Sequence, residues 1–198
     1  MCPASRRPEL KPESVSRFLV ARAAKHLRDG GILAYPTEAV FGLGCDPFDK
    51  AAVEWIFLRK GRPGSKSFIL VAASYAQVEP LISDEVSADQ RAKLAASWPG
   101  PVTWVIPAAH SVPDWLTAAD GTIAVRVSAH PIVRALCFAF GGPIVSTSAN
   151  PSGKRPARSA LTVRHYFSTD PIQILAGRIG GQSKPSAIYD LRSGAKLR

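Results

Sequence analysis

The sequence has few cysteines, and none of them is placed as a disulfide or a zinc site requires. Cys2, Cys45 and Cys137 are odd in number, far apart and without a CxxC pair. This spacing argues against both a disulfide framework and a cysteine-bound zinc ion. Thiols that stay free are typical of a reducing compartment.

Long apolar runs are missing as well. The N-terminal stretch MCPASRRPELKPES lacks the apolar core of a secretory signal, and no uninterrupted apolar stretch is long enough to cross a membrane. Together with the free thiols, this predicts a cytoplasmic protein with no membrane partner. Residues 1–13 are polar, basic and contain proline, which predicts a flexible tail before the folded domain.

Acidic residues are outnumbered by basic ones. The chain has 15 Asp and Glu against 25 Lys and Arg, and the net charge of +10 favours phosphate-bearing partners, either nucleotides or RNA. Hydrophobic residues make up 46% of the 198 residues, which is enough to bury a core. The length suits one domain, predicted over residues 14–198.

Helical and strand patterns alternate along the chain. A first helix is expected to begin at Ser14, to bury Phe18 and Leu27, and to end at Gly30. Asp49 is expected to cap the next helix. The remaining predicted elements are strands at 32–35, 68–72, 102–106, 122–128, 144–150, 172–175 and 187–191, and helices at 74–97 (interrupted near Pro80), 131–140 and 159–167. This alternation predicts a single α/β domain with a twisted mixed sheet and flanking helices.

Four polar segments lie at strand ends. In the first, Thr37 and Glu38 follow a strand and precede Gly42 and Gly44. These glycines free the backbone to approach a ligand closely. The alternative is an ordinary loop built from proline and glycine.

The second segment is the basic stretch LRKGRPGSKS, residues 58–67, which contains Lys60 and Arg62. It lacks the order GxxxxGK[ST], and it leads from a helix into a strand, whereas a phosphate-binding P-loop leads from a strand into a helix. One reading is a solvated basic turn at a helix C-terminus, where cations are favourable. The other is a grip on a polyphosphate or a carboxylate, which Arg62 can bind in a bidentate manner.

The third segment is TIAVRVS, in which Arg126 lies among apolar neighbours. A buried arginine needs a partner, because an unpaired buried charge is costly. That partner is either a structural carboxylate or an anionic ligand.

The fourth segment is PIVSTSANPSG, residues 143–153. Residues two apart in a strand share a face, so Ser146, Ser148 and Asn150 are predicted to point together while Thr147 points away. With neighbouring backbone N–H groups they could cradle phosphate oxygens, and the amide of Asn150 is then expected to have few partners within the protein. The alternative is a helix cap followed by a turn.

A covalent nucleophile is not indicated. The four histidines lie apart in the sequence, and HExxH and GxSxG motifs are missing. The site is therefore predicted to work by holding its reactants together.

The segments YPTEAVFGLGCDP, KGRP, WPGPVTWVIPA, AVRVSAHP and STSANPSG, in this order, resemble the YrdC/TsaC family of threonylcarbamoyl-AMP synthases. The resemblance spans roughly residues 14–191 and is greatest to the short bacterial form, which lacks the C-terminal domain of longer relatives. It implies an α/β fold around a large basic cavity. It also implies a reaction of L-threonine, bicarbonate (or CO2) and ATP, after which other proteins transfer the threonylcarbamoyl group to a tRNA adenosine next to the anticodon.

The resemblance also implies roles for particular residues. The catalytic pair would be Lys60 and Arg62. Together with these two, the ATP site would include Ser146, Ser148 and Asn150. Threonine and its carbamate would be bound by Thr37, Ser67, Thr103, Arg126 and Ser186. Mg²⁺ would enter with ATP, with no metal ligands expected from the protein itself.

Two other functions remain open on the sequence alone. The charge of +10 is compatible with a double-stranded RNA-binding or ribosome-maturation protein, although the polar motifs are strand ends rich in glycine and serine instead of exposed aromatics among basic residues. A related fold occurs in carbamoyl-phosphate-using hydrogenase maturation proteins, but their zinc-finger and acylphosphatase segments are missing from this sequence. Direct contact with tRNA through the basic surface also stays open.

Overall fold

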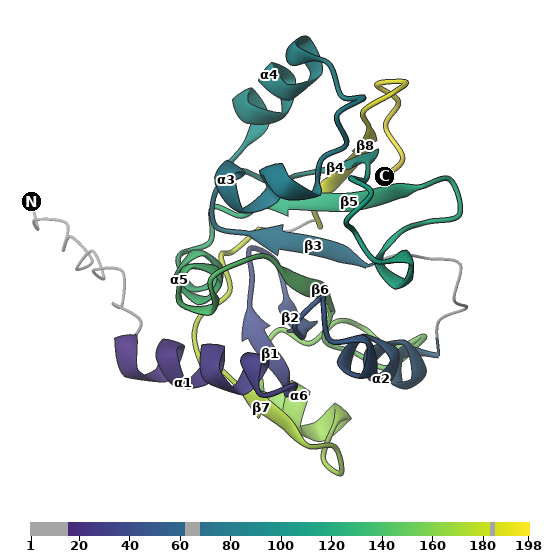
Figure 1. The fold of residues 1–198 in the computed structure, drawn as a ribbon. Coiled ribbons are helices and arrows are strands. Elements are labelled where there is room, and N and C mark those ends of the chain that lie inside the picture. The colour runs from purple at the N-terminus through teal and green to yellow at the C-terminus, as the bar shows by residue number, and fades with distance from the viewer. Residues whose placement is uncertain (1–15, 62–67, 183–184) are drawn as a thin grey trace, which may run out of the picture.

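The computed structural model describes residues 16–61, 68–182 and 185–198. Within these ranges the strands form one eight-stranded mixed sheet in the order β7-β1-β2-β6-β3-β5-β4-β8 (Figure 1). The strands are β1 Ile32–Pro36, β2 Phe41–Gly44, β3 Ile69–Ala72, β4 Val102–Pro107, β5 Thr122–Val127, β6 Ile144–Ser148, β7 Ile172–Ile174 and β8 Ala187–Asp190. The predicted α/β fold with a mixed sheet is confirmed.

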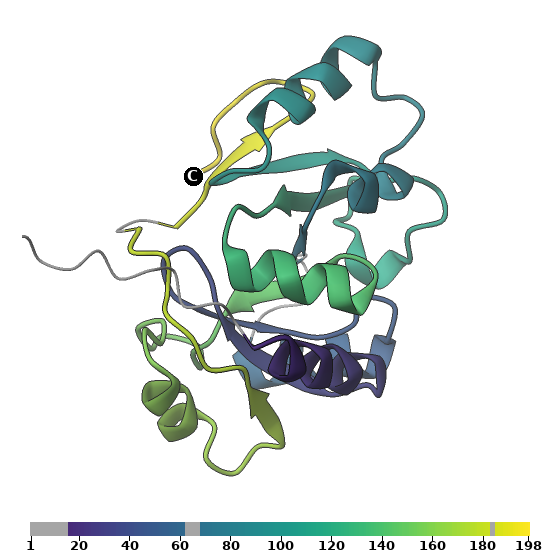
Figure 2. The ribbon, with the colours of Figure 1, turned by 90° about the vertical axis from the view of Figure 1, so that its left-hand side faces the viewer.

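Helices pack on both faces of this sheet. They are α1 Arg17–Arg28, α2 Lys50–Lys60, α3 Tyr75–Val78, α4 Ala88–Ser97, α5 Pro131–Phe140 and α6 Ala160–Tyr166, with short 3₁₀ turns η1 Glu79–Leu81 and η2 Asp114–Leu116. Helices α1 and α5 lie side by side (Figure 2), and Leu27 and Leu136 join Tyr35 of β1 in one buried apolar cluster. The opposite face carries the larger cluster, to which α2 contributes Ile56 and α4 contributes Leu94.

Local capping chemistry explains several helix ends. The side chain of Asp49 accepts a hydrogen bond from the Ala52 N–H at the start of α2, as predicted. Helix α2 ends at Gly61, whose φ of 54° is in the left-handed region that glycine adopts without strain. Ser159 caps α6 in the same way as Asp49 caps α2. These boundaries follow from short stretches of sequence.

One expectation about helices is wrong. Phe18 is 72% exposed, because α1 packs through the stripe at positions 20, 23, 24 and 27, and position 18 lies on the other side of the helix. Helix α1 begins after Ser16, and Ser14 lies outside the described residues. The interruption predicted near Pro80 within residues 74–97 is confirmed. Pro80 cannot donate a helical hydrogen bond, and α4 starts afresh at a capping box formed by Ser87 and Gln90.

The register of β6 sets the direction of its polar side chains. Ser146 is paired with Ile69 of β3, and Ser148 is paired with Gly42 of β2. Directly paired residues share a face of the sheet, so the two serines point the same way and Thr147 points the other way. The alternation predicted for Ser146 and Ser148 is confirmed.

The same face carries polar residues from two further strands. Arg126 of β5 is paired with Val71 of β3, which belongs to the apolar cluster under α1 and α5. Val105 of β4 is paired with Ala124, so Thr103 of β4 and Arg126 also point to this face. One face of the sheet is therefore part apolar, under helices α1 and α5, and part polar.

The cysteine thiols within the described residues are free. Cys45 and Cys137 are both buried and unbonded, and Cys2 lies outside the described residues. Burial raises the pKa of Cys137 to about 12, which keeps its thiol protonated and unreactive at neutral pH. Of the helices in the described part of the chain, none combines the length and the apolar character that a membrane crossing needs.

Candidate functional site

Lys60 lies at the C-terminal end of α2, almost fully buried against the end of β6. Its Nζ donates to the backbone oxygen of Ser148 at 2.6 Å and to that of Asn150 at 2.9 Å. The side-chain oxygens of the same two residues lie 3.4 Å away. The structure thus brings three of the predicted ATP-site residues into direct contact. We call Lys60, Ser146, Ser148 and Asn150 the nucleotide group.

Asn150 differs from expectation in two respects. Strand β6 ends at Ser148, so Asn150 lies beyond the strand and its direction does not follow from alternation. Its amide nitrogen donates to the backbone oxygens of Pro151 at 2.9 Å and Lys154 at 2.8 Å. The expectation that this amide has few partners within the protein is therefore wrong. The side chain holds the turn that follows β6, because an asparagine there can bond to nearby backbone groups.

Ser146 lies beside a tyrosine in the middle of the sheet. The hydroxyl of Tyr35 donates to the backbone oxygen of Val145 at 3.2 Å. Burial raises the pKa of Tyr35 well above its ordinary value, although a hydrogen bond with Ser146 partly lowers it, so the phenol is neutral. The backbones approach closely here, because a Cβ at Gly44 would lie only 2.0 Å from the Val145 oxygen. This glycine is needed for packing between β2 and β6.

Thr37 follows β1 and is buried. Its Oγ1 donates to the backbone oxygen of Val40 at 2.7 Å, which leaves the oxygen lone pairs free to accept a hydrogen bond. A later segment of the chain runs beside this loop. The N–H of Gly180 donates to the backbone oxygen of Thr37, and that of Gln182 donates to the backbone oxygen of Glu38. Thr37 is thus held rigidly with an acceptor to spare.

Arg126 is paired with a carboxylate. Its Nη2 lies 3.2 Å from Oε2 of Glu38, and both side chains are about nine-tenths buried. The other carboxylate oxygen of Glu38 accepts a hydrogen bond of 2.6 Å from the Ser128 hydroxyl. Burial alone would raise the pKa of Glu38, but the charge of Arg126 and the bond from Ser128 outweigh it, so this pKa lies below its ordinary value. Of the two partners expected for Arg126, the structural carboxylate is present.

His130 closes this network at the start of α5. Its backbone N–H donates to the Ser128 hydroxyl at 3.1 Å, and its Nε2 lies 3.2 Å from the backbone oxygen of Arg178. Burial lowers the pKa of His130, and the nearby carboxylate of Glu38 only partly offsets this. A neutral imidazole that donates from Nε2 leaves Nδ1 as a bare acceptor, and Nδ1 is buried without a hydrogen-bond partner among the described residues.

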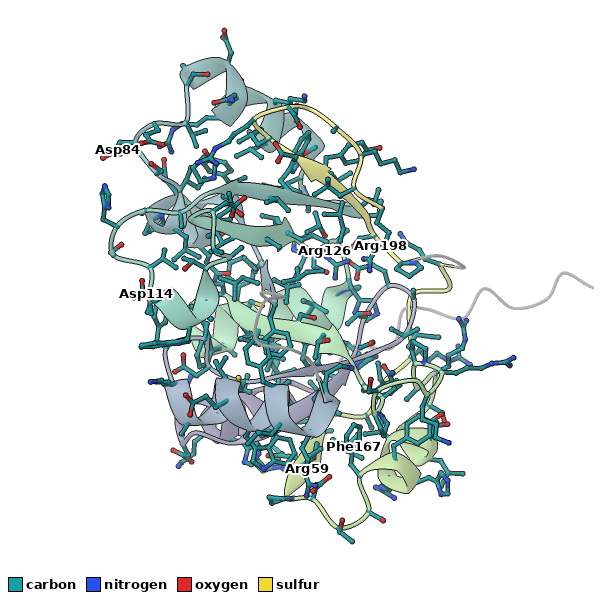
Figure 3. The ribbon with its side chains drawn as sticks, turned by 90° about the vertical axis from the view of Figure 1, so that its right-hand side faces the viewer. Arg59, Asp84, Asp114, Arg126, Phe167 and Arg198 are labelled. Carbon is teal, nitrogen blue, oxygen red and sulfur yellow. The ribbon has the colours of Figure 1, made fainter. Side chains whose placement is uncertain are left out.

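Thr103 and Ser186 meet across β4 and β8. Their hydroxyl oxygens are 3.0 Å apart, and both residues are buried. The backbone oxygen of Ser186 also accepts a bond of 3.2 Å from Arg198, near the end of the chain. Burial and the charge of Arg126 lower the pKa of Arg198, and Figure 3 shows the two arginines near each other. We call Thr37, Thr103, Arg126 and Ser186 the hydroxyl–arginine group.

Direct contacts join Lys60 to Ser148 and Asn150, and Thr103 to Ser186. The division of the site residues between ATP and threonine stays a prediction. Arg62 and Ser67 lie outside the described residues. Glu38, Ser128 and Arg198 belong to the surroundings of Arg126 but were not predicted as site residues. Of these, only Glu38 could have been noticed in the sequence, because a buried arginine requires a carboxylate.

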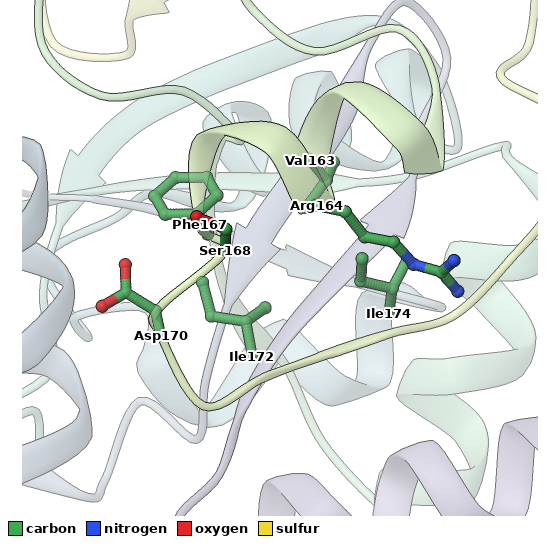
Figure 4. A pocket seen from close by; sticks show the side chains of 7 residues that line it. All are labelled: Val163, Arg164, Phe167, Ser168, Asp170, Ile172 and Ile174. Carbon is green, nitrogen blue, oxygen red and sulfur yellow. The ribbon is translucent and has the colours of Figure 1, made fainter.

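Two cavities lie away from these residues. One of about 430 Å³ is formed by α6 and β7 (Figure 4), with an apolar base that includes Phe167 and Ile172 and a rim that includes Arg164 and Asp170. Another of about 310 Å³ lies near Ser83 and His110. Asp170 is already paired with Arg59. The large basic cavity implied by the resemblance is not shown by the described residues and stays a prediction.

Metal ligands are not clustered in the described part of the chain, where no group of three or more His, Cys, Asp or Glu residues could hold an ion. The Glu38 carboxylate is held by Arg126 and Ser128, so it is not free to bind a cation.

These features define an α/β domain with a mixed sheet. One face of the sheet carries Ser146, Ser148, Thr103 and Arg126, and Lys60 reaches the end of β6 from α2. The family model described as telomere recombination, Sua5_yciO_yrdC, matches residues 25–198. The chain belongs to this Sua5/YciO/YrdC family, and the resemblance read from the motifs is confirmed.

Individual relatives agree with this assignment. The chain is 50% identical over 187 residues to the threonylcarbamoyl-AMP synthase of Halorhodospira halophila, covering 94% of this chain and 97% of the relative. The solved structure of P. abyssi Sua5 complexed with L-threonine has a TM-score of 0.82 and 35% identity, and the match covers 91% of this chain but only 53% of Sua5. This chain thus spans about half the length of Sua5.

A nucleotide-bound structure of full-length HypF has a TM-score of 0.75, with 98% of this chain and 30% of HypF covered. The identity is 21%, so this likeness shows the fold alone.

Proposed function

We propose that this protein makes L-threonylcarbamoyl-AMP from L-threonine, bicarbonate (or CO2) and ATP, with release of pyrophosphate. One water is released as well where bicarbonate is the one-carbon source, when it is dehydrated to CO2. One observation carries the proposal. A chain that is 50% identical to a threonylcarbamoyl-AMP synthase over nearly its whole length carries Ser146 and Arg126 on one face of its sheet, with Lys60 bonded to the end of β6. The nucleotide group suits phosphate oxygens, and the hydroxyl–arginine group suits an amino acid with a hydroxyl and a carboxylate.

In this proposal the nucleotide group binds ATP. Ser146 and Ser148 point from β6 to the shared face and can donate hydrogen bonds to phosphate oxygens. Lys60 supplies positive charge beside them, and Arg62, two residues further along the chain, is proposed to add a second cation. Charge that develops on the α-phosphate during the reaction is stabilised by such fixed cations. Asn150 holds the turn and contributes its amide at the edge of the group.

The hydroxyl–arginine group is proposed to bind threonine and its carbamate. Arg126 keeps an Nε–H without a partner among the described residues, which leaves a donor for a carboxylate or carbamate oxygen. Thr37 has an acceptor to spare for the substrate amine or hydroxyl. Thr103 and Ser186 offer a pair of hydroxyls. Ser67 is assigned to this group from the resemblance alone.

In this proposal the protein positions the reactants and forms no covalent bond with them. The amine of threonine adds to CO2 and gives a carbamate, an oxygen of which attacks the α-phosphorus of ATP. The bond from this phosphorus to the bridging oxygen breaks, and pyrophosphate leaves. Because a carbamate is labile in water, a site that excludes water protects it. Alignment of the two reactants supplies most of the rate enhancement.

Other components follow from the same proposal. Mg²⁺ enters as the magnesium complex of ATP and offsets charge on the phosphates. Bicarbonate is the one-carbon source. The product passes to other tRNA-threonylcarbamoylation proteins, which modify the adenosine next to the anticodon, and the basic surface of this chain is a candidate contact for tRNA. We place the protein in the cytoplasm, where thiols such as Cys45 and Cys137 stay reduced.

The test is an incubation of the purified protein with Mg–ATP, L-threonine and labelled bicarbonate. We expect pyrophosphate release that requires threonine, together with label in an adenylate detected by mass spectrometry. Arg126→Ala should lose this activity, whereas Arg192→Ala, which removes an exposed arginine, should retain it. Pyrophosphate released at the same rate without threonine would reject the proposal.

A further inference from the structure

The carboxylate of Glu38 is held by one hydrogen bond and one ion pair, although Oε2 has no hydrogen-bond partner among the described residues. Oε1 accepts the 2.6 Å hydrogen bond from Ser128, and Oε2 lies 3.2 Å from Nη2 of Arg126. Ser128 is itself held, because its hydroxyl accepts from the His130 N–H at the start of α5. The backbone oxygen of Glu38 accepts from Gln182, which ties the loop after β1 to the returning chain. Contacts with Ser128, Arg126 and Gln182 therefore hold Glu38 in place.

Arg126 is fixed less completely. Its charge is paired with Glu38, but its Nε–H is buried and has no hydrogen-bond partner among the described residues. Charge from Arg198 lies nearby and repels it. A guanidinium with a long side chain and a second cation beside it would adopt several orientations without an anchor. The ion pair with Glu38 selects one of them.

The geometry points to Glu38 as a positioning residue, which orients the guanidinium of Arg126 so that its unpaired N–H faces the carboxylate or carbamate of the amino-acid substrate. This inference rests on the proposed function, since it concerns how the amino-acid site is organised. A displacement of about 1 Å in a substrate-holding group can cost on the order of 10²-fold in rate. The carboxylate thus acts through Arg126 and does not contact the reacting atoms.

A second role for Glu38, as the base that removes a proton from the threonine ammonium, agrees poorly with the same contacts. Oε1 accepts the hydrogen of the Ser128 hydroxyl, and Oε2 faces the cation of Arg126. Burial alone would raise the pKa of Glu38, but the charge of Arg126, the bond from Ser128 and smaller contributions together lower it below its ordinary value, and a weaker base accepts a proton less readily. The two roles make opposite predictions for a glutamine at position 38.

Glutamine keeps the shape of the side chain. Its amide oxygen can accept from Arg126, and its amide N–H can donate to the Ser128 hydroxyl, whose hydrogen rotates away. Positioning therefore survives in Glu38→Gln, whereas proton transfer does not. Glu38→Ala removes the anchor altogether. These two variants separate geometry from acid–base chemistry.

The experiment measures the KM for threonine, kcat, and threonine and ATP affinity by calorimetry in the full chain. We expect Glu38→Gln to stay within about 3-fold of the wild type. We expect Glu38→Ala to raise the threonine KM by roughly 10- to 100-fold with a smaller change in kcat, and to leave ATP affinity unchanged. The double variant Glu38→Ala/Arg126→Ala should bind threonine no more weakly than Arg126→Ala alone, because both changes remove one interaction. Glu54→Ala, at an exposed carboxylate paired with Lys50, is the matched control.

Three results would overturn the inference. The first is a Glu38→Gln variant whose threonine KM rises as much as that of Glu38→Ala. The second is a Glu38→Ala variant with a normal threonine KM. The third is a double variant in which the losses of threonine affinity from the two single changes add up. If Glu38→Ala does not fold, Ser128→Ala removes one anchor of the carboxylate and should raise the threonine KM by about 3- to 10-fold, and an unchanged KM would overturn the inference. Failure of the proposed function is distinct, because it would show as missing threonine-dependent pyrophosphate release in the wild type. The calorimetric comparison of threonine binding does not depend on that activity.

Discussion

Replacing Lys60 by methionine should destabilise the protein before any ligand is added. Met keeps the apolar stem of the side chain but removes the ammonium group that donates at 2.6 and 2.9 Å to two backbone oxygens. A hydrogen bond to a charged group contributes about 1.5–3 kcal/mol, and since the two share one donor group we take about 4 kcal/mol in total. For a chain of this size each kcal/mol shifts the melting temperature by about 2–4 °C, so we expect a loss of roughly 8–16 °C.

The control lies on the same helix. Lys50 is exposed, and its Nζ is 3.7 Å from a carboxylate oxygen of Glu54. Such surface pairs contribute less than about 1 kcal/mol, so Lys50→Met should melt within about 3 °C of the wild type. Thermal melts by circular dichroism without nucleotide make the comparison. A Lys60→Met variant that melts with the wild type would refute the reasoning that Lys60 holds the end of β6.

The same melts with ATP test the binding role separately. A ligand that binds only the folded state raises the melting temperature according to its concentration and affinity. We expect ATP to stabilise the wild type and Lys50→Met alike, and to stabilise Lys60→Met much less. Lys60 then contributes to both stability and binding, whereas the motif indicated roles in catalysis and ATP binding alone. An undiminished ATP shift in Lys60→Met would remove Lys60 from the nucleotide group.

Three further outcomes follow from the structure. Asn150→Ala should lower the free energy of unfolding by about 1–2 kcal/mol in urea titrations, since two hydrogen bonds to Pro151 and Lys154 are lost, and unchanged stability would contradict this. Gly44→Ala should cost about 1–3 kcal/mol or more, because its Cβ would meet the Val145 oxygen at 2.0 Å, whereas Gly142→Ala, with open space around it, should melt nearly as the wild type does. The pKa of His130 in the folded protein is below its unfolded value of 6.5. The contribution of His130 to the free energy of unfolding is therefore fully present above pH 6.5 and falls as the pH drops below 6.5. His130→Gln should lose that part of the pH dependence in urea titrations between pH 7.5 and 5.5, and an equal slope in both proteins would exclude His130 as its source.

Much of the fold could be predicted because its determinants are local. Asp49 and Ser159 cap helices through N–H groups only three residues away, and Gly61 ends α2 through its own conformation. Phe18 was misplaced because a helical stripe can be drawn through several apolar residues, and only packing against α5 selects positions 20, 23, 24 and 27. Local patterns therefore locate elements, while tertiary contacts decide which side of an element is buried.

The candidate site was harder to predict, since its contacts join distant parts of the chain. Lys60 meets Ser148 across 88 positions, and Glu38 meets Ser128 across 90. Alternation indicated the direction of Ser146 and Ser148 but failed for Asn150, because β6 ends two residues earlier and a turn reorients the amide. A motif identifies such residues without showing whether each one holds a ligand, the backbone, or both.

Arg126 shows that a structural carboxylate and an anionic ligand are not mutually exclusive partners for a buried arginine. The sequence required a partner for this arginine and left a structural carboxylate and an anionic ligand as alternatives. Glu38 meets the first requirement through an ion pair, yet the Nε–H of Arg126 stays buried and without a hydrogen-bond partner among the described residues. A guanidinium fully bonded to the protein would have no donor left for a substrate, and one with no acceptor beside it would be costly to bury. Partial satisfaction by Glu38 keeps the cation in the sheet and leaves it a donor to bind with.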